Sequence, residues 1–118
     1  MNLLKRILSV ETYATYINIT GWETIYSKGG YIITANDEFC NLQVYLNSTW
    51  CDSTLRPATD ENILPDEYKP RSPVSATDFA GNVRAVVRDN ESHVSIQSLT
   101  GGVYTGAWYL EMLWKRRK

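Results

Sequence analysis

Apolar and polar residues alternate along several stretches of the chain, and a period of two is typical of half-buried β-strands. The clearest stretch covers residues 39–46, where apolar side chains occupy one face and Asn, Gln and Tyr occupy the other. Residues 83–88 and 93–97 alternate in the same way, and the polar residues 89–92 between them are turn-prone. This pair predicts an antiparallel hairpin.

Strand-forming residues also fill the first part of the chain. Residues 13–20 and 22–27 are rich in Tyr, Ile, Thr and Trp, and a Lys-Gly-Gly turn leads into residues 31–34. All four prolines fall within residues 57–73, which predicts a long irregular connection because proline lacks a backbone donor. No long stretch has convincing helical periodicity. The pattern therefore predicts an all-β fold, an antiparallel β-sandwich or jelly roll of about eight strands.

The length of 118 residues suits one hydrophobic core and leaves little for a second. We expect a single domain over residues 13–118, preceded by a short lead-in, stalk or docking segment over residues 1–12. Lys5 and Arg6 interrupt the apolar residues of this lead-in, so we expect neither membrane insertion nor an export signal.

Composition excludes several classes of function. A formal net charge of −1 lacks the basic surface of a dedicated nucleic-acid-binding protein. One His and two Cys are too few for a conventional zinc finger or a His-rich metal site. The sequence also has no phosphate-binding glycine motif. We therefore expect no nucleic-acid partner, no metal and no cofactor.

The groups that might suggest catalysis have simpler interpretations. The adjacent carboxylates at 37–38, 60–61 and 66–67 lie in polar turns, where neighbouring side chains diverge and form no glycosidase pair. His93 lies beside Ser95 on the polar face of a strand, without a nucleophile elbow, which favours an exposed or interface histidine. We predict that the chain is not an enzyme.

The two cysteines lie at either end of one predicted strand. Cys40 falls on the apolar face, which favours a buried thiol. A disulfide to Cys51 stays open as an alternative, and it would require the chain to fold back after Thr49.

One proline-rich segment resembles a known family. The run Ile63-Leu-Pro-Asp-Glu-Tyr-Lys-Pro70 is similar to the L-P-x-x-Y-R/K-P segment found near the C-termini of many phage tail-fibre and receptor-binding proteins. The order of the remaining features over residues 20–114 agrees with it, including the early Gly21-Trp22 strand, the later hairpin and the aromatic last strand. Independently of the family, Leu64 and Tyr68 are placed to dock apolar side chains around an exposed turn, as an architectural clamp.

The resemblance implies a compact, usually homotrimeric head domain that binds saccharides on a bacterial surface. It also implies contacts with other tail or baseplate proteins, and a place in the virion after synthesis in the bacterial cytoplasm. A structural tail or virion sandwich without a ligand is the main alternative. A glycan-cleaving enzyme is a more remote one.

Saccharides stack on aromatic rings and form hydrogen bonds with planar polar groups, which selects candidate ligand-binding residues. Trp50 is the least core-like tryptophan, and we group it with the loop residues Asp52 and Arg56. A second candidate group is His93 with Gln97, on the polar face of a strand.

The last strand, residues 104–114, is apolar on both faces, so we expect it to be either central in the sandwich or covered by a neighbouring subunit. The chain has 8 Tyr and 4 Trp, more aromatic surface than one thin sandwich readily covers. We therefore predict subunit contacts through five of its residues: Tyr104, Trp108, Tyr109, Met112 and Trp114.

Overall fold

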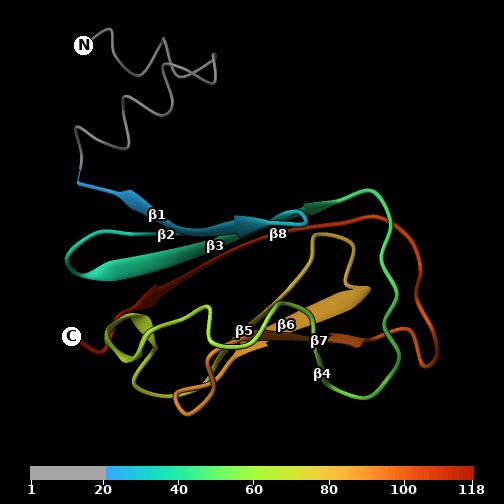
Figure 1. Cartoon of the computed structure of the whole chain (residues 1–118). Helices are drawn as coiled ribbons and strands as arrows, with labels where there is room; N and C mark the ends of the chain where they lie inside the picture. The colour runs from blue at the N-terminus through green and yellow to red at the C-terminus, as the bar shows by residue number, and fades with distance from the viewer. Residues whose placement is uncertain (1–20) are drawn as a thin grey trace, which may run out of the picture.

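Two four-stranded antiparallel sheets pack face to face in the computed structural model, which describes residues 21–118 (Figure 1). The first sheet has the spatial order β1 (Glu23–Lys28), β2 (Tyr31–Ala35), β3 (Phe39–Leu46) and β8 (Trp108–Lys115). The second has the order β4 (Arg56–Pro57), β7 (Val94–Ser98), β6 (Val83–Val87) and β5 (Val74–Thr77). A single 3-10 turn, η2 (Asp66–Tyr68), interrupts the strands of the described chain. The predicted all-β sandwich is confirmed.

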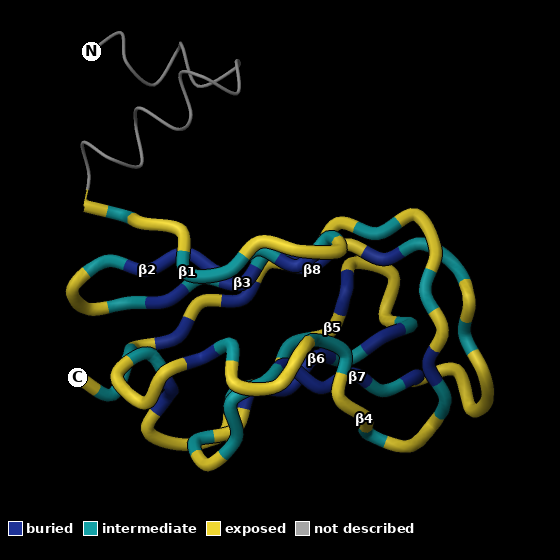
Figure 2. The backbone as a smooth tube through the Cα atoms, viewed as in Figure 1, coloured by how far each residue is buried: buried dark blue, intermediate teal, exposed yellow. Residues whose placement is uncertain are grey.

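The facing sides of the two sheets follow the alternation seen in the sequence. In β3, the side chains of Cys40, Leu42 and Val44 point into the core and are at most 2% exposed. Residues 83, 85 and 87 of β6 do the same from the second sheet. Figure 2 shows this burial along the facing strands, with most exposed residues in the connections. Periodicity alone therefore fixed which face of these strands is buried.

The last strand corrects the interface prediction. β8 lies at the edge of its sheet, paired with β3 on one side only, so it is not central. Trp108, Met112 and Trp114 are 1%, 5% and 3% exposed and pack between the two sheets of a single chain. Their burial needs no second subunit, so they are core residues. Of the predicted interface residues, Tyr109 is 43% exposed and Tyr104 is half-buried.

Two short strands were not predicted. β4 contains Pro57 and lies at a sheet edge, where a missing backbone donor is tolerated. β5 follows Pro73 and pairs with β6, with partners running from Val74↔Val87 to Thr77↔Arg84. Residues 58–73 form the long connection between these strands, as the proline cluster predicted. The predicted strand over residues 13–20 and the lead-in over 1–12 lie outside the described residues.

The predicted clamp forms at one end of the sandwich. Leu64 is 1% exposed, whereas Asp66 and Glu67 face solvent. The carbonyl of Tyr68 accepts hydrogen bonds from the indole N–H of Trp114 at 2.8 Å and from the thiol of Cys40 at 3.3 Å. The segment thus joins the end of β8 to the start of β3.

The connections gather at the two ends of the molecule, which differ in character (Figure 1). We call the end formed by residues 36–38, 64–70, 88–93 and 115–118 the clamp end. We call the other, formed by residues 29–30, 47–55, 78–82 and 99–107, the loop end. Within residues 21–118, no helix is long and apolar enough to cross a membrane.

Candidate functional site

Backbone hydrogen bonds tie the connections of the loop end to one another. Cys51 and Tyr104 exchange two backbone hydrogen bonds, of 3.1 and 2.8 Å. The amide of Ser98 donates to the carbonyl of Asp52 at 2.7 Å, and the amide of Leu99 donates to the carbonyl of Asn82 at 2.9 Å. The loops are therefore fixed by main-chain contacts, which leaves many of their side chains free to face outward.

A pocket of about 360 Å³ opens at this end, between the two sheets. Its walls come from both sheets and from the β3–β4 connection, and they comprise Tyr31, Leu46, Thr49, Trp50, Cys51, Arg56, Pro57, Ala58 and Ile96. The side chain of Trp50 is 57% exposed at the pocket, in agreement with the prediction that it is not a core tryptophan. An indole in this position offers an open ring face next to a concave surface.

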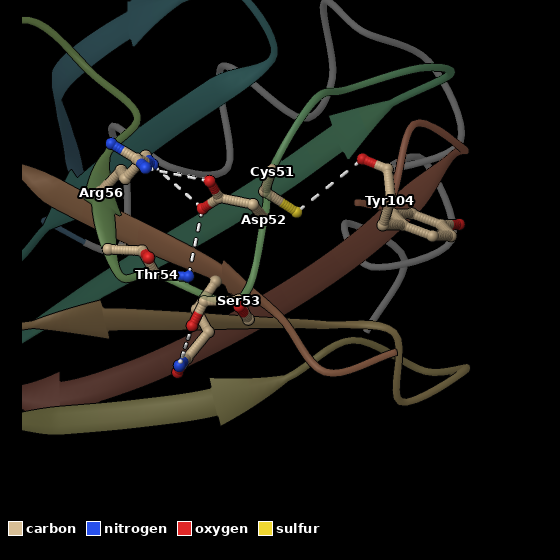
Figure 3. A network of polar contacts seen from close by, with 7 residues as sticks. Cys51, Asp52, Ser53, Thr54, Arg56 and Tyr104 are labelled. Atoms are coloured by element: carbon tan, nitrogen blue, oxygen red, sulfur yellow. Dashed lines mark hydrogen bonds and ion pairs between the residues drawn. The ribbon is translucent and has the colours of Figure 1, made fainter. Parts of the chain in front are cut away.

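Arg56 enters the pocket in a fixed orientation. Its Nε and Nη2 atoms donate to the two carboxylate oxygens of Asp52, each at 2.9 Å (Figure 3). The amide of Thr54 also donates to Asp52 Oδ1, at 3.1 Å. These contacts hold the pKa of Asp52 below its usual range and raise that of Arg56. The other N–H groups of the guanidinium are not used by Asp52 and can donate hydrogen bonds to a ligand.

Gln97 supports this loop. Its side-chain amide donates to the carbonyl of Ser53 at 2.9 Å, which anchors the segment between Asp52 and Arg56 to β7. Gln97 does not line the pocket. It is a neighbour of the site that also positions the loop.

His93 does not join the other predicted residues. It precedes β7 at the clamp end, four positions and roughly 13 Å along the strand from Gln97. Its side chain is 15% exposed, and its Nε2 lies 3.8 Å from the carboxylate of Glu91. The predicted group of His93 with Gln97 is therefore wrong as a single site, because the residues lie near opposite ends of one strand.

Several pocket residues were missed in the sequence. Tyr31 is 6% exposed and its ring meets the edge of Trp108, with centroids 6.1 Å apart. Burial raises the pKa of Tyr31, so its hydroxyl stays protonated at neutral pH. Tyr31, Leu46 and Ile96 lie in separate segments and only the packing of the two sheets brings them together.

Both cysteines are free and buried, as expected for Cys40. Burial raises the pKa of the Cys40 thiol to about 11 and also raises that of Cys51. The two residues occupy opposite ends of the sandwich, one near the clamp and one in the pocket wall. The alternative of a disulfide between them is therefore not realised. A protonated Cys51 thiol is a poor nucleophile, so it contributes shape to the pocket.

Among the described residues, the groups considered for catalysis are not gathered in the pocket. Ser95, considered with His93 as a nucleophile, is 4% exposed and outside the pocket. No carboxylate is among the described residues that line the pocket, and that of Asp52, which neighbours the lining residue Cys51, is paired with Arg56. No group of three or more His, Cys, Asp or Glu in residues 21–118 is arranged to hold a metal ion. Comparisons of the chain with protein families, curated proteins and solved structures gave no match.

Proposed function

We propose that this chain is the head domain of a phage tail-fibre or receptor-binding protein that binds host surface saccharides without catalysis. The observation that supports it is the loop-end pocket, where exposed Trp50 stands beside a guanidinium held in place by Asp52. The similarity of residues 63–70 to the family segment supports the same assignment. In this proposal the chain belongs to the virion tail and contacts other tail or baseplate proteins.

The pocket suits a sugar ring for two physical reasons. The C–H face of a pyranose stacks on an indole, and ring hydroxyls accept hydrogen bonds from the free N–H groups of Arg56. Because the Asp52–Arg56 pair is already formed, little side-chain entropy is lost when a ligand binds.

The outer face of the first sheet is the best candidate for subunit contacts in a homotrimer. Tyr45 and Leu113 are 71% and 57% exposed there, and the rings of Tyr45 and Tyr109 lie 4.5 Å apart. A shallow hollow of about 480 Å³ beside this pair is lined by both tyrosines with Gln43 and Glu111. Exposed aromatic rings next to a few polar groups are typical of interface centres. The contact we propose therefore uses the outward face of β8, instead of the buried tryptophans.

A glycan array with the full chain tests the saccharide proposal. We expect binding to at least one bacterial polysaccharide, and a loss of about tenfold or more for Trp50→Ala. Trp50→Phe keeps a ring for stacking and serves as the matched variant, with a smaller loss expected. The free energy of unfolding of both variants should stay within about 1 kcal/mol of the parent. No binding by a correctly folded, assembled chain would contradict the proposal.

The alternative is a structural tail or virion sandwich that only makes assembly contacts. It shares the exposed Tyr45–Tyr109 face with the first proposal but gives Trp50 no role. Sedimentation velocity tests the assembly: a homotrimer is expected, and a stable monomer at micromolar concentration would contradict both versions. A trimer without glycan binding would favour the structural alternative.

A further inference from the structure

The outer face of the second sheet has a single charged side chain on its three longer strands. In β5, β6 and β7 the only charged residue is Arg84, among Ser, Thr, Gln and small apolar residues. The inward positions 83, 85 and 87 of β6 belong to the core, so alternation places Arg84 on the outward side. Within these three strands, the outward side therefore has one cation and no acidic residue to balance it.

The guanidinium of Arg84 is partly desolvated, and residues 21–118 give it no partner. Its Nε is buried, yet it has no hydrogen-bond partner among residues 21–118, and no ion pair forms to Arg84 within that range. Buried N–H groups of proteins are nearly always paired, and a cation removed from water without a counter-charge is costly. The two Nη groups are not among the buried atoms, so an acceptor from outside the described residues would reach the guanidinium through them.

The neighbours of Arg84 supply further polar contacts. The strand register places Thr77 of β5 on one side of Arg84 and Gln97 of β7 on the other. The Gln97 side chain in turn holds Ser53, in the same loop as Trp50 and Asp52. A row of hydroxyl, guanidinium and amide groups thus leads across the sheet to the proposed saccharide site.

A fully exposed aromatic residue follows Thr77 by two positions in the chain. Phe79, in the turn between β5 and β6, is 100% exposed. The turn is rigid, because Asp78 is 5% exposed and its Oδ1 accepts the amides of Asn82 at 2.7 Å and Val83 at 3.0 Å. A fully exposed Phe on a fixed turn costs little entropy when it packs on a ligand.

We propose that Phe79, Arg84 and Gln97 form a second subsite, which takes an acidic group of the bound saccharide. The acidic group is a carboxylate or a phosphate. Each has two oxygen atoms that can accept parallel hydrogen bonds from one guanidinium. Phe79 packs against the adjoining sugar ring. This inference rests on the proposed saccharide-binding function and adds to it the charge of the ligand.

Binding to three polymers separates the outcomes: a polygalacturonate, a poly(glycerol phosphate) and an uncharged dextran. We expect at least one acidic polymer to bind more tightly than dextran, and Arg84→Gln to weaken that binding about tenfold. Arg88→Gln is the matched control, since it removes the same charge four positions along the chain, just past the end of β6, where the Arg88 Nε lies 3.7 Å from the carboxylate of Glu91. Phe79→Ala should weaken polymer binding several-fold.

Results with the polymers distinguish this inference from the proposed function. Binding that is lost in Trp50→Ala but unchanged in Arg84→Gln would overturn the acidic subsite and leave the saccharide proposal intact. A preference for carboxylate or phosphate identifies the source of the acidic group.

A ligand-independent measurement uses the side-chain NMR signal of Arg84 Nε–H. Titration of the full chain with sodium phosphate at constant ionic strength should shift this signal saturably, and Arg84→Gln removes it and so confirms its assignment. An unchanged signal for Arg84, or an equal shift at Arg88, would overturn the subsite.

Discussion

The two ends of the sandwich use their polar groups in opposite ways. At the clamp end, side chains bind the backbone: the Trp114 indole donates to Tyr68, and the ring of Tyr68 lies 4.3 Å beneath the guanidinium carbon of Arg116. Lys69, although charged, is only 8% exposed and binds Asp66 at 2.6 Å. At the loop end, the ties between connections are mostly backbone to backbone, and Trp50 and Phe79 face solvent.

The two ends therefore differ in how many side chains the fold itself uses. Side chains at the clamp end already satisfy carbonyls and close the core, so changing them costs stability. Main-chain ties at the loop end do most of the holding, with a few side chains such as Asp78 and Gln97 added to them, so the exposed Trp50 and Phe79 are not used by the fold. Substitutions at the two ends should therefore separate stability from binding.

The largest effect is expected at the clamp end, from Trp114→Ala. Loss of a 3% exposed indole should lower the free energy of unfolding by about 3–5 kcal/mol, as measured by urea denaturation. Trp114→Phe keeps a six-membered aromatic ring but removes the pyrrole part of the indole together with the donor to Tyr68, so we expect a loss smaller than that of Trp114→Ala. The neighbouring Leu113→Ala, at a 57% exposed position, should change stability by no more than about 0.5 kcal/mol. Equal losses at positions 113 and 114 would contradict the inward orientation of β8.

A smaller loss of stability is expected at the loop end, from Gly30→Ala. Gly30 has φ +87°, and an added Cβ would lie 2.4 Å from Leu46 Cδ2 and 2.9 Å from the carbonyl oxygen of Tyr45. We expect a loss of about 2–4 kcal/mol by urea denaturation, from strain and overpacking together. Gly29→Ala shares the positive φ, at +59°, but meets open space and should cost only about 1 kcal/mol. A Gly30 variant as stable as the Gly29 variant would show that the turn is not packed on Leu46.

The smallest effect concerns pH. Since Arg56 lowers the pKa of Asp52 below its ordinary 3.8, the ion pair is intact above that value and is lost as pH falls through the lower pKa of the folded state. Saccharide affinity, measured by calorimetry, should stay constant near neutral pH and fall only below about pH 4. Circular dichroism at each pH checks that the fold persists.

Asp52→Asn should weaken saccharide binding at neutral pH, and the affinity of this variant should no longer fall below about pH 4. The matched control is Asp60→Asn, because Asp60 also has a lowered pKa, through Lys28 at 2.8 Å, but lies outside the pocket. If the affinity of Asp52→Asn still falls at acidic pH, another group causes the pH dependence.

Prediction from sequence succeeded where one face of a strand is uniformly apolar. β3 has the predicted bounds, and β6 and β7 lie within a residue of the predicted hairpin strands. It failed for β4, because two residues are too few to show an alternating pattern. It also failed for β5, because this short strand directly follows Pro73 and was read as part of the irregular connection. In the candidate site, Trp50, Asp52 and Arg56 were found because they are close in sequence, whereas Tyr31 and Ile96 meet them only through packing.

The fold class, the buried faces of β3 and β6 and the clamp at residues 64–70 could all be predicted from local patterns, because periodicity and proline restrict the backbone locally. Which aromatic side chains are buried and which are exposed depends on how the two sheets pack. Trp108 and Tyr109 are adjacent and both aromatic, yet one is 1% and the other 43% exposed. What separates them is the second sheet, which covers one side of β8 and leaves the other open, and strand alternation alone does not state which side that is.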